Sequence, residues 1–181
     1  ERFGDGVTPE QRGVKGDHLI GEFYVAFDRA FRDEYVAWLG TDDAAAAFEG
    51  WGASNAARKA VQGWAKARRK AGEPEVPTDG ELRELFDGGY KDVYFNTHSE
   101  LGGASRELLR KWEAEDADVR ALWGRLNGWV EAGFAQTYER LGIHFDRIDH
   151  ESETYKLGKD LVEAGLTDGV FHRAANGAAV F

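Results

Sequence analysis

The sequence of 181 residues contains no cysteine and no methionine, and it has only three prolines. Without cysteine the chain cannot form a disulfide framework or a cysteine-based zinc site. No apolar run approaches the roughly 18 residues of a membrane-spanning helix, and no secretory signal peptide is recognisable. We therefore expect a cytoplasmic protein without a membrane-bound part. Because the chain starts at Glu1 and lacks methionine, we also expect a segment of a longer polypeptide.

The short motifs that mark several common catalytic sites are missing as well. The five histidines have no H-E-x-x-H or comparable spacing, so we expect no metal site. The sequence contains neither a G-x-x-x-x-G-K-[ST] phosphate-binding loop nor a G-x-S-x-G nucleophile elbow. These absences argue against a P-loop nucleotide site and against an α/β-hydrolase triad.

Helical patterns are abundant in the first and last thirds of the chain. Apolar residues spaced three or four apart predict a helix that opens at Gly16 or Asp17 and ends at Gly40. Its aromatic side chains are expected to pack in a core rather than to stack on bases. A second long helix is predicted to start after the N-cap Asp116 and to stop at Gly142.

The segments that surround the second long helix have weaker patterns. Residues 105–115 are expected to form a helix, residues 143–146 a strand, and Ser152 is expected to cap a helix that ends near Gly165. The Asn176-Gly177 dipeptide predicts a C-terminal β-hairpin. Residues 78–86 are expected to form a short helix that Asp87-Gly88-Gly89 ends, and residues 90–96 either a strand or a helical turn.

Several long sequence words in these regions occur together and in order. They are TPEQRGVKGDHLIGEFYVAFDRAF at the start, then LLRKWEAEDADVRALW, W-V-x-A-G-F-x-x-T-Y-x-R-L-G-I-x-F-D and E-S-E-T-Y-x-L-G-K-D within residues 105–171. This series resembles arginyl-tRNA synthetase, and specifically a middle segment of its class I catalytic domain. Long words in register are far more specific than one short motif.

The resemblance implies the chemistry of the parent enzyme. Arginine and ATP, with Mg²⁺, would give arginyl-adenylate, and the arginyl group would pass to the 3′ end of its tRNA, in an enzyme expected to be monomeric. Neither ATP signature of the family is present: His18-Leu19-Ile20-Gly21 lacks the spacing of H-x-G-H, and no Lys-Met-Ser-Lys-Ser-type loop occurs. No catalytic residue is therefore assigned, and the segment is expected to be inactive alone. The alternative is a helical RNA- or protein-binding module without catalysis.

The fold class expected from patterns and resemblance is α/β. We expect a predominantly helical segment of a Rossmann-type nucleotide-binding domain, with a few short strands and a C-terminal hairpin. Residues 1–40 form a helical connective segment in this interpretation, residues 41–104 a variable insertion, and residues 105–181 the entry into the second half of the catalytic domain.

A basic stretch stands out in a chain whose formal net charge is −10. Six basic residues and no acidic residue occur between Gly50 and Gly72. On a helix, Arg58, Lys66 and Arg69 share a face opposite Val61 and Trp64. The face either pairs with acidic neighbours or contacts the tRNA backbone. The candidate tRNA contacts are Arg58, Lys59, Lys66, Arg69, Lys70 and Trp64.

A second polar cluster follows the expected strand. Its candidates are Glu151, Ser152 and Tyr155. A helix cap explains the serine and the carboxylates, because a hydroxyl accepts from backbone N–H groups and acids favour a helix N-terminus. The end of a strand in an open α/β sheet is also where ligands bind, so these residues are candidates for support of the active site.

Overall fold

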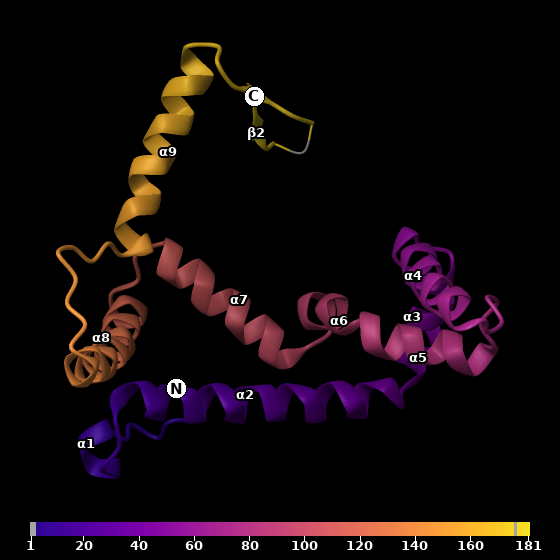
Figure 1. Ribbon diagram of the computed structural model, residues 1–181, viewed down its shortest axis with the longest axis horizontal. Coiled ribbons are helices and arrows are strands. Elements are labelled where there is room, and N and C mark those ends of the chain that lie inside the picture. The colour runs from indigo at the N-terminus through magenta and orange to yellow at the C-terminus, as the bar shows by residue number, and fades with distance from the viewer. Residues whose placement is uncertain (1–2, 176) are drawn as a thin grey trace. The chain divides into compact units, whose positions relative to one another are not determined.

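The computed structural model describes residues 3–175 and 177–181, with the backbone alone for Tyr155 and Lys156. The chain divides into two compact units, Glu1–Gln136 and Thr137–Phe181. Figure 1 shows their elements along the chain. The described helices are α1 (Pro9–Arg12), α2 (Gly16–Leu39), α3 (Asp42–Gly52), α4 (Asn55–Ala71), α5 (Asp79–Gly89), α6 (Lys91–Thr97), α7 (Glu100–Glu113), α8 (Ala117–Leu141) and α9 (Glu151–Thr167).

An aromatic core joins helices α2 to α6 of the first unit. Tyr35 and Trp38 of α2 are buried against Phe86 of α5 and Tyr94 of α6, with Trp51 of α3 in the same cluster. The ring centroids of Trp38 and Tyr94 are 4.8 Å apart, a separation typical of favourable aromatic pairs. The expected core role of the α2 aromatics is thus confirmed for these two residues.

Polar groups tie α2 to the following helices. The Tyr94 hydroxyl and the Glu100 N–H donate to Oε1 of Glu34, at 3.1 and 2.6 Å. The Tyr35 hydroxyl donates to the Asp87 carbonyl at 3.0 Å. Burial raises the pKa of both tyrosines to about 12, and the neighbouring carboxylates add to the shift. Both hydroxyls are therefore held in their neutral, donating form.

Glycines allow two close backbone crossings in this unit. A Cβ on Gly102 of α7 would lie 1.8 Å from the carbonyl oxygen of Phe95, and one on Gly16 would lie 2.1 Å from that of Trp129 in α8. Gly133 of α8 similarly faces the carboxylate of Asp17, at 2.1 Å from Oδ1. Any larger residue would force these helices apart.

The long helices begin and end as the sequence predicts. The α2 helix runs from Gly16 to Leu39, with Gly40 as its C-cap. Oδ1 of Asp116 accepts from the N–H groups of Asp118 and Val119 at 3.1 Å, which caps α8. Gly142 follows the helix with a φ of +65°. Both predicted helices are confirmed.

The shorter helices differ from the prediction. The α7 helix begins at Glu100 rather than at residue 105, because Ser99 caps it by accepting from the Gly102 N–H at 2.9 Å. The α5 helix continues through Gly89, so the Asp87-Gly88-Gly89 stretch does not end it. Residues 91–97 are helical, which settles the choice between strand and helix.

The second unit combines α9 with a hairpin. Strands β1 (His172–Arg173) and β2 (Ala179–Val180) pair antiparallel, with His172 opposite Val180, so the predicted hairpin is confirmed. Asn176, half of the predicted turn dipeptide, lies outside the described residues. The predicted strand at 143–146 is wrong: this exposed stretch has no partner strand that would satisfy its backbone groups.

The predominantly helical character is confirmed, and the hairpin is the single sheet found in the described part of the chain. No parallel strands occur in that part. Of the helices described there, none is both long and apolar enough to cross a membrane.

Candidate nucleic-acid interface

The basic stretch folds as α4. Ser54 accepts from the Ala57 N–H at 3.1 Å and so caps the first turn. Gly72 ends the helix with a φ of +73°, a conformation that favours glycine. Basic residues fill the last turn, where positive charge interacts favourably with the helix dipole. The helix packs against α3 and α5, with buried Ala57 in the aromatic core and half-buried Ala60 against it.

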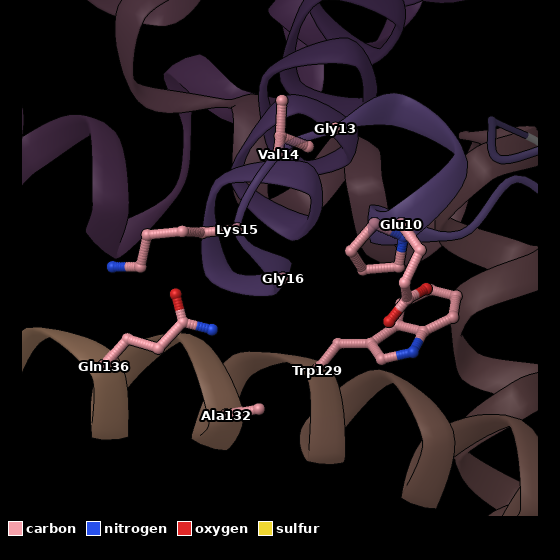
Figure 2. Close-up of a pocket in the computed structure, with 9 residues that line it drawn as sticks. Glu10, Gly13, Val14, Lys15, Gly16, Trp129, Ala132 and Gln136 are labelled. Carbon is pink, nitrogen blue, oxygen red and sulfur yellow. The ribbon is translucent and has the colours of Figure 1, made fainter.

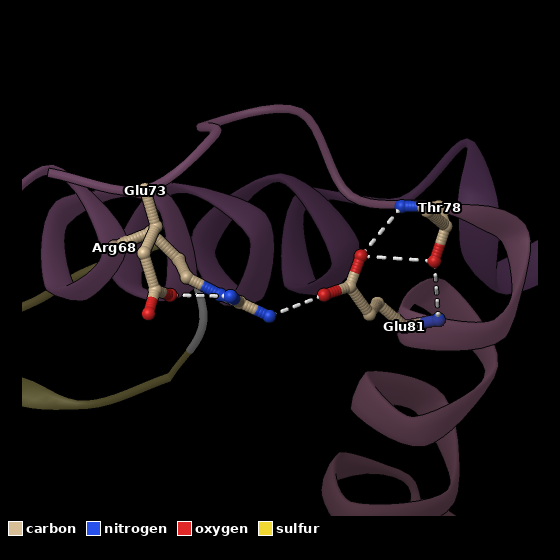
Figure 3. A network of polar contacts seen from close by, with 4 residues as sticks. All are labelled: Arg68, Glu73, Thr78 and Glu81. Atoms are coloured by element: carbon tan, nitrogen blue, oxygen red, sulfur yellow. Dashed lines mark hydrogen bonds and ion pairs between the residues drawn. The ribbon is translucent and has the colours of Figure 1, made fainter. Parts of the chain in front are cut away.

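Arg68 is held in place by carboxylates. Figure 3 shows its guanidinium between Glu73 and Glu81, donating to both. Glu81 also accepts from the backbone N–H and the hydroxyl of Thr78, at 2.8 and 2.9 Å. The hydrogen bond to Glu73 raises the pKa of Arg68, and the bond from the Thr78 backbone lowers the pKa of Glu81. Arg68 therefore fixes the α4–α5 linker.

Two of the six tRNA-contact candidates are engaged within the chain. Arg69 forms a two-pronged ion pair with Glu75, with 2.8 Å from its Nε to Oε1, and this pairing lowers the pKa of Glu75. The guanidinium of Arg68 lies 4.8 Å from the centroid of the Trp64 ring and covers one of its faces. One face of the half-buried Trp64 is thus already occupied by a side chain of the same helix.

The other four candidates face solvent. Arg58, Lys59, Lys66 and Lys70 are exposed, and no carboxylate pairs with them among the side chains that the structure describes. At about 100° per residue, the three lysines lie within roughly 40° of one another on α4. We call Lys59, Lys66 and Lys70 the lysine strip. Pairing with acidic neighbours is thus observed for Arg69, and contact with the tRNA backbone stays a prediction for the four exposed residues.

An apolar hollow adjoins this face of α4. It has a volume of about 310 Å³ and joins residues from three helices: Phe48, Trp51, Gly52, Ala57, Arg58, Val61, Gln62 and Leu82. The sequence does not predict this hollow, because its walls come from separate segments. Helical spacing relates Ala57 to Val61, but nothing in the sequence brings Leu82 of α5 beside them.

A second hollow, of about 400 Å³, lies between the α1–α2 junction and α8. Figure 2 shows Trp129 and Gln136 of α8 extending toward the segment that carries Glu10 and Lys15. Lys15 binds the carboxylate of Asp17 at 3.4 Å, so its charge is compensated within the chain. The hollow lacks a cationic surface like that of α4.

The candidates at the start of α9 have a different arrangement from the one predicted. The helix begins at Glu151 after the N-cap His150, whose carbonyl accepts from the Glu153 and Thr154 N–H groups at 2.9 and 3.0 Å. Ser152 is therefore inside the first turn, and its prediction as the cap is wrong. Glu151 is exposed and Ser152 half-buried. The side chain of Tyr155 lies outside the described residues.

No family model and no solved structure matches this chain. Curated relatives do match it. The chain is 37% identical over 172 residues to an arginine–tRNA ligase of Phocaeicola vulgatus, which covers 95% of this chain and 22% of the relative. It is 35% and 34% identical over 178 residues to the arginine–tRNA ligases of Parabacteroides distasonis and Bacteroides fragilis, which covers 98% of this chain and 22% of each.

The predicted resemblance is thereby confirmed. The chain spans about a fifth of the length of the curated relatives that it matches, since 22% of each is covered. A match over 98% of the chain also includes most of residues 41–104, the stretch that carries α4.

Proposed function

Because this chain is homologous along nearly its whole length to one segment of arginine–tRNA ligases, we propose that it works as part of such an enzyme. The parent would use ATP with Mg²⁺ to activate arginine and would transfer it to the 3′ end of its tRNA, in the cytoplasm and as a monomer. Its role would be in protein biosynthesis. The segment would belong to the class I, Rossmann-type catalytic domain. ATP and arginine would bind residues outside these 181.

Within this function, the lysine strip of α4 contacts the tRNA backbone. The supporting observation is the contrast along one helix: Arg68 and Arg69 are neutralised by carboxylates, and the strip is exposed without such partners among the described side chains. The chain as a whole is acidic, so its net charge repels RNA. A local cluster of exposed lysines gives the phosphates a place to bind by releasing their counterions.

The test is binding of arginine tRNA across a salt series, by this chain and by the triple variant Lys59→Glu, Lys66→Glu, Lys70→Glu. We expect binding that weakens with salt, and a slope of log K against log salt smaller by about two to three in the variant. The matched control changes Lys91, Lys111 and Lys159, which are exposed on α6, α7 and α9, to Glu. It has the same net charge and should keep the slope. Equal losses in the two variants would contradict the proposal.

The absence of both ATP signatures implies that the segment alone does not activate arginine. Arginine-dependent exchange of pyrophosphate into ATP should therefore be undetectable with this chain, with or without tRNA. Measurable exchange would show that the adenylate forms on residues of this segment, against the proposal.

A further inference from the structure

The hollow beside α4 has the composition of a site for a flat, partly apolar ligand. Its walls are mainly aliphatic and aromatic: Val61, Leu82 and Phe48 are half-buried, and Trp51 is 7% exposed. Its volume of about 310 Å³ lies at the lower end of the roughly 300–1,000 Å³ typical of ligand pockets. Polar groups among its lining side chains come from Arg58, Gln62 and the indole N–H of Trp51.

The hollow and the lysine strip are neighbours around the same helix. At about 100° per residue, Val61, Arg58 and Gln62 follow one another around α4, and the lysines of the strip come next. Arg58 and Gln62 thus line the hollow at the border with the strip. Arg58 is exposed and has no carboxylate partner among the described side chains.

A ligand that satisfies both surfaces carries negative charge next to a flat ring with polar edges. An unpaired nucleotide has this combination, because its phosphate is anionic and its base has apolar faces and hydrogen-bonding edges. Unpaired bases of RNA are commonly bound against aromatic or arginine side chains, with their edges hydrogen-bonded to protein groups. In a duplex both faces of a base are already stacked, so its bases cannot enter such a hollow.

We propose that the hollow binds one unpaired nucleobase of RNA, while the lysine strip and Arg58 bind the adjoining phosphates. This inference rests on the proposed RNA contact of α4 and extends it from the backbone to a base. The base lies against Val61 and Leu82, the Gln62 amide reaches its edge, and Arg58 binds the phosphate at the border.

Gly52, the last residue of α3, offers a way to fill the hollow. It lines the hollow, and a Cβ built on it meets no heavy atom within 4 Å. Gly50 on the same helix also has open space around its Cβ but does not line the hollow. Gly52→Leu and Gly50→Leu therefore add the same side chain to the same helix, at a residue that lines the hollow and at one that does not.

The experiment measures the affinity of both variants and of the unchanged chain for a short single-stranded RNA and for a duplex RNA of the same sequence. Gly52→Leu should weaken single-stranded binding roughly 5- to 100-fold, the range expected when one stacked base is lost, and should leave duplex binding unchanged. Gly50→Leu should change neither affinity. If circular dichroism shows that Gly52→Leu has lost helix content, Leu82→Phe takes its place. This variant fills the hollow from α5 and should weaken single-stranded binding in the same way.

The outcomes separate this inference from the proposed function. One outcome is that charge reversal of the lysine strip weakens the binding of both RNAs while Gly52→Leu and Leu82→Phe weaken the binding of neither. In that case the backbone contact stands and the base site is overturned. If the unchanged chain binds no RNA at any salt concentration, both fall. If the chain self-associates and Gly52→Leu abolishes this, the hollow holds a second copy of the chain, and the base site is overturned as well.

Discussion

The helices around Trp38 and the unit formed by residues 137–181 use apolar side chains in opposite ways. In the first region, Phe86 and Leu19 are fully buried, and Tyr35 is 1% exposed. In the second, none of the side chains that the structure describes is buried, and Leu161 is 72% exposed. The first region has a core built from distant segments. The second has helical and hairpin structure that depends on local contacts.

This difference shows what local sequence signals achieve by themselves. The α9 helix has 17 residues and begins after the N-cap His150. Its contact with the following segment is local, since Phe171 packs beside Gly165. Such contacts determine a helix but bury little area, and most of the stability of a helix in a protein comes from burial of one face. The core in the first unit adds this burial. We therefore expect the two regions to respond differently to the same kind of substitution.

The largest expected effect is loss of a core ring. Phe86→Ala removes a fully buried side chain and should lower the free energy of unfolding of the first unit by about 3–5 kcal/mol. Leu161→Ala on the exposed face of α9 should change the free energy of unfolding of the second unit by less than about 0.5 kcal/mol. Urea unfolding followed by circular dichroism measures both. Similar costs for the two variants would break the comparison.

Glycine substitutions sharpen the same comparison, because we expect alanine to destabilise the first unit at one glycine and to stabilise α9 at another. Gly102→Ala places a Cβ 1.8 Å from the Phe95 carbonyl oxygen and should cost about 1–3 kcal/mol. Gly158→Ala in α9 meets no atom within 4 Å and should stabilise that helix by about 0.5–1 kcal/mol, because alanine loses less backbone entropy. Thermal unfolding of both variants gives the signs. Stabilisation by Gly102→Ala would refute the close crossing of α6 and α7.

Alkaline pH should weaken the first unit selectively. The pKa of Tyr35 and of Tyr94 is raised from 10.0 to about 12, so the folded state keeps these hydroxyls neutral where the unfolded chain ionises them. Their contribution is complete below pH 10 and is lost as the pH rises toward 12. The loss should be roughly 1 kcal/mol or more per tyrosine.

The control for the alkaline series is Tyr35→Phe. This variant loses the hydrogen bond to the Asp87 carbonyl at every pH, but it should also show a shallower decline between pH 10 and 12. Denaturant unfolding at several pH values measures the slope. An unchanged slope in the variant would show that Tyr35 ionises equally in both states.

The smallest expected effect concerns the linker between α4 and α5. The pKa of Glu81 is lowered by its hydrogen bonds from Thr78 and by Arg68, so this contact is present at neutral pH and is lost as the pH falls through the lowered value. The Thr78 amide resonance should therefore titrate with a midpoint below 4.5, the ordinary value of glutamate. Glu81→Gln should abolish this titration while the resonances of the aromatic core stay unchanged.

The sequence predicts features that depend on neighbouring residues more accurately than features that join distant ones. Asp116 and Gly142 mark the ends of α8 correctly, because caps act within one turn. The short run at 143–146 predicts a strand, but a strand needs a partner that the described residues do not supply. Ser152 was a plausible cap by residue type, yet the backbone of His150 begins the helix two residues earlier.

The candidate site follows the same rule. The basic face of α4 is readable from helical spacing alone, since all its residues belong to one element. Helical spacing does not show which basic residues of α4 are paired and which are exposed, because the partners Glu73, Glu75 and Glu81 lie beyond the helix. The hollow also escapes prediction, since Leu82 and Phe48 meet only through the packing of α3, α4 and α5.

The most direct test of the RNA contact is lysine footprinting of this chain with and without arginine tRNA. An acetylating reagent and mass spectrometry report how much each exposed lysine reacts. The account predicts that tRNA protects Lys59, Lys66 and Lys70 and leaves Lys91 and Lys159 as reactive as before. Protection of Lys159 in α9 with no protection of the lysine strip would place the RNA on the second unit and contradict the account.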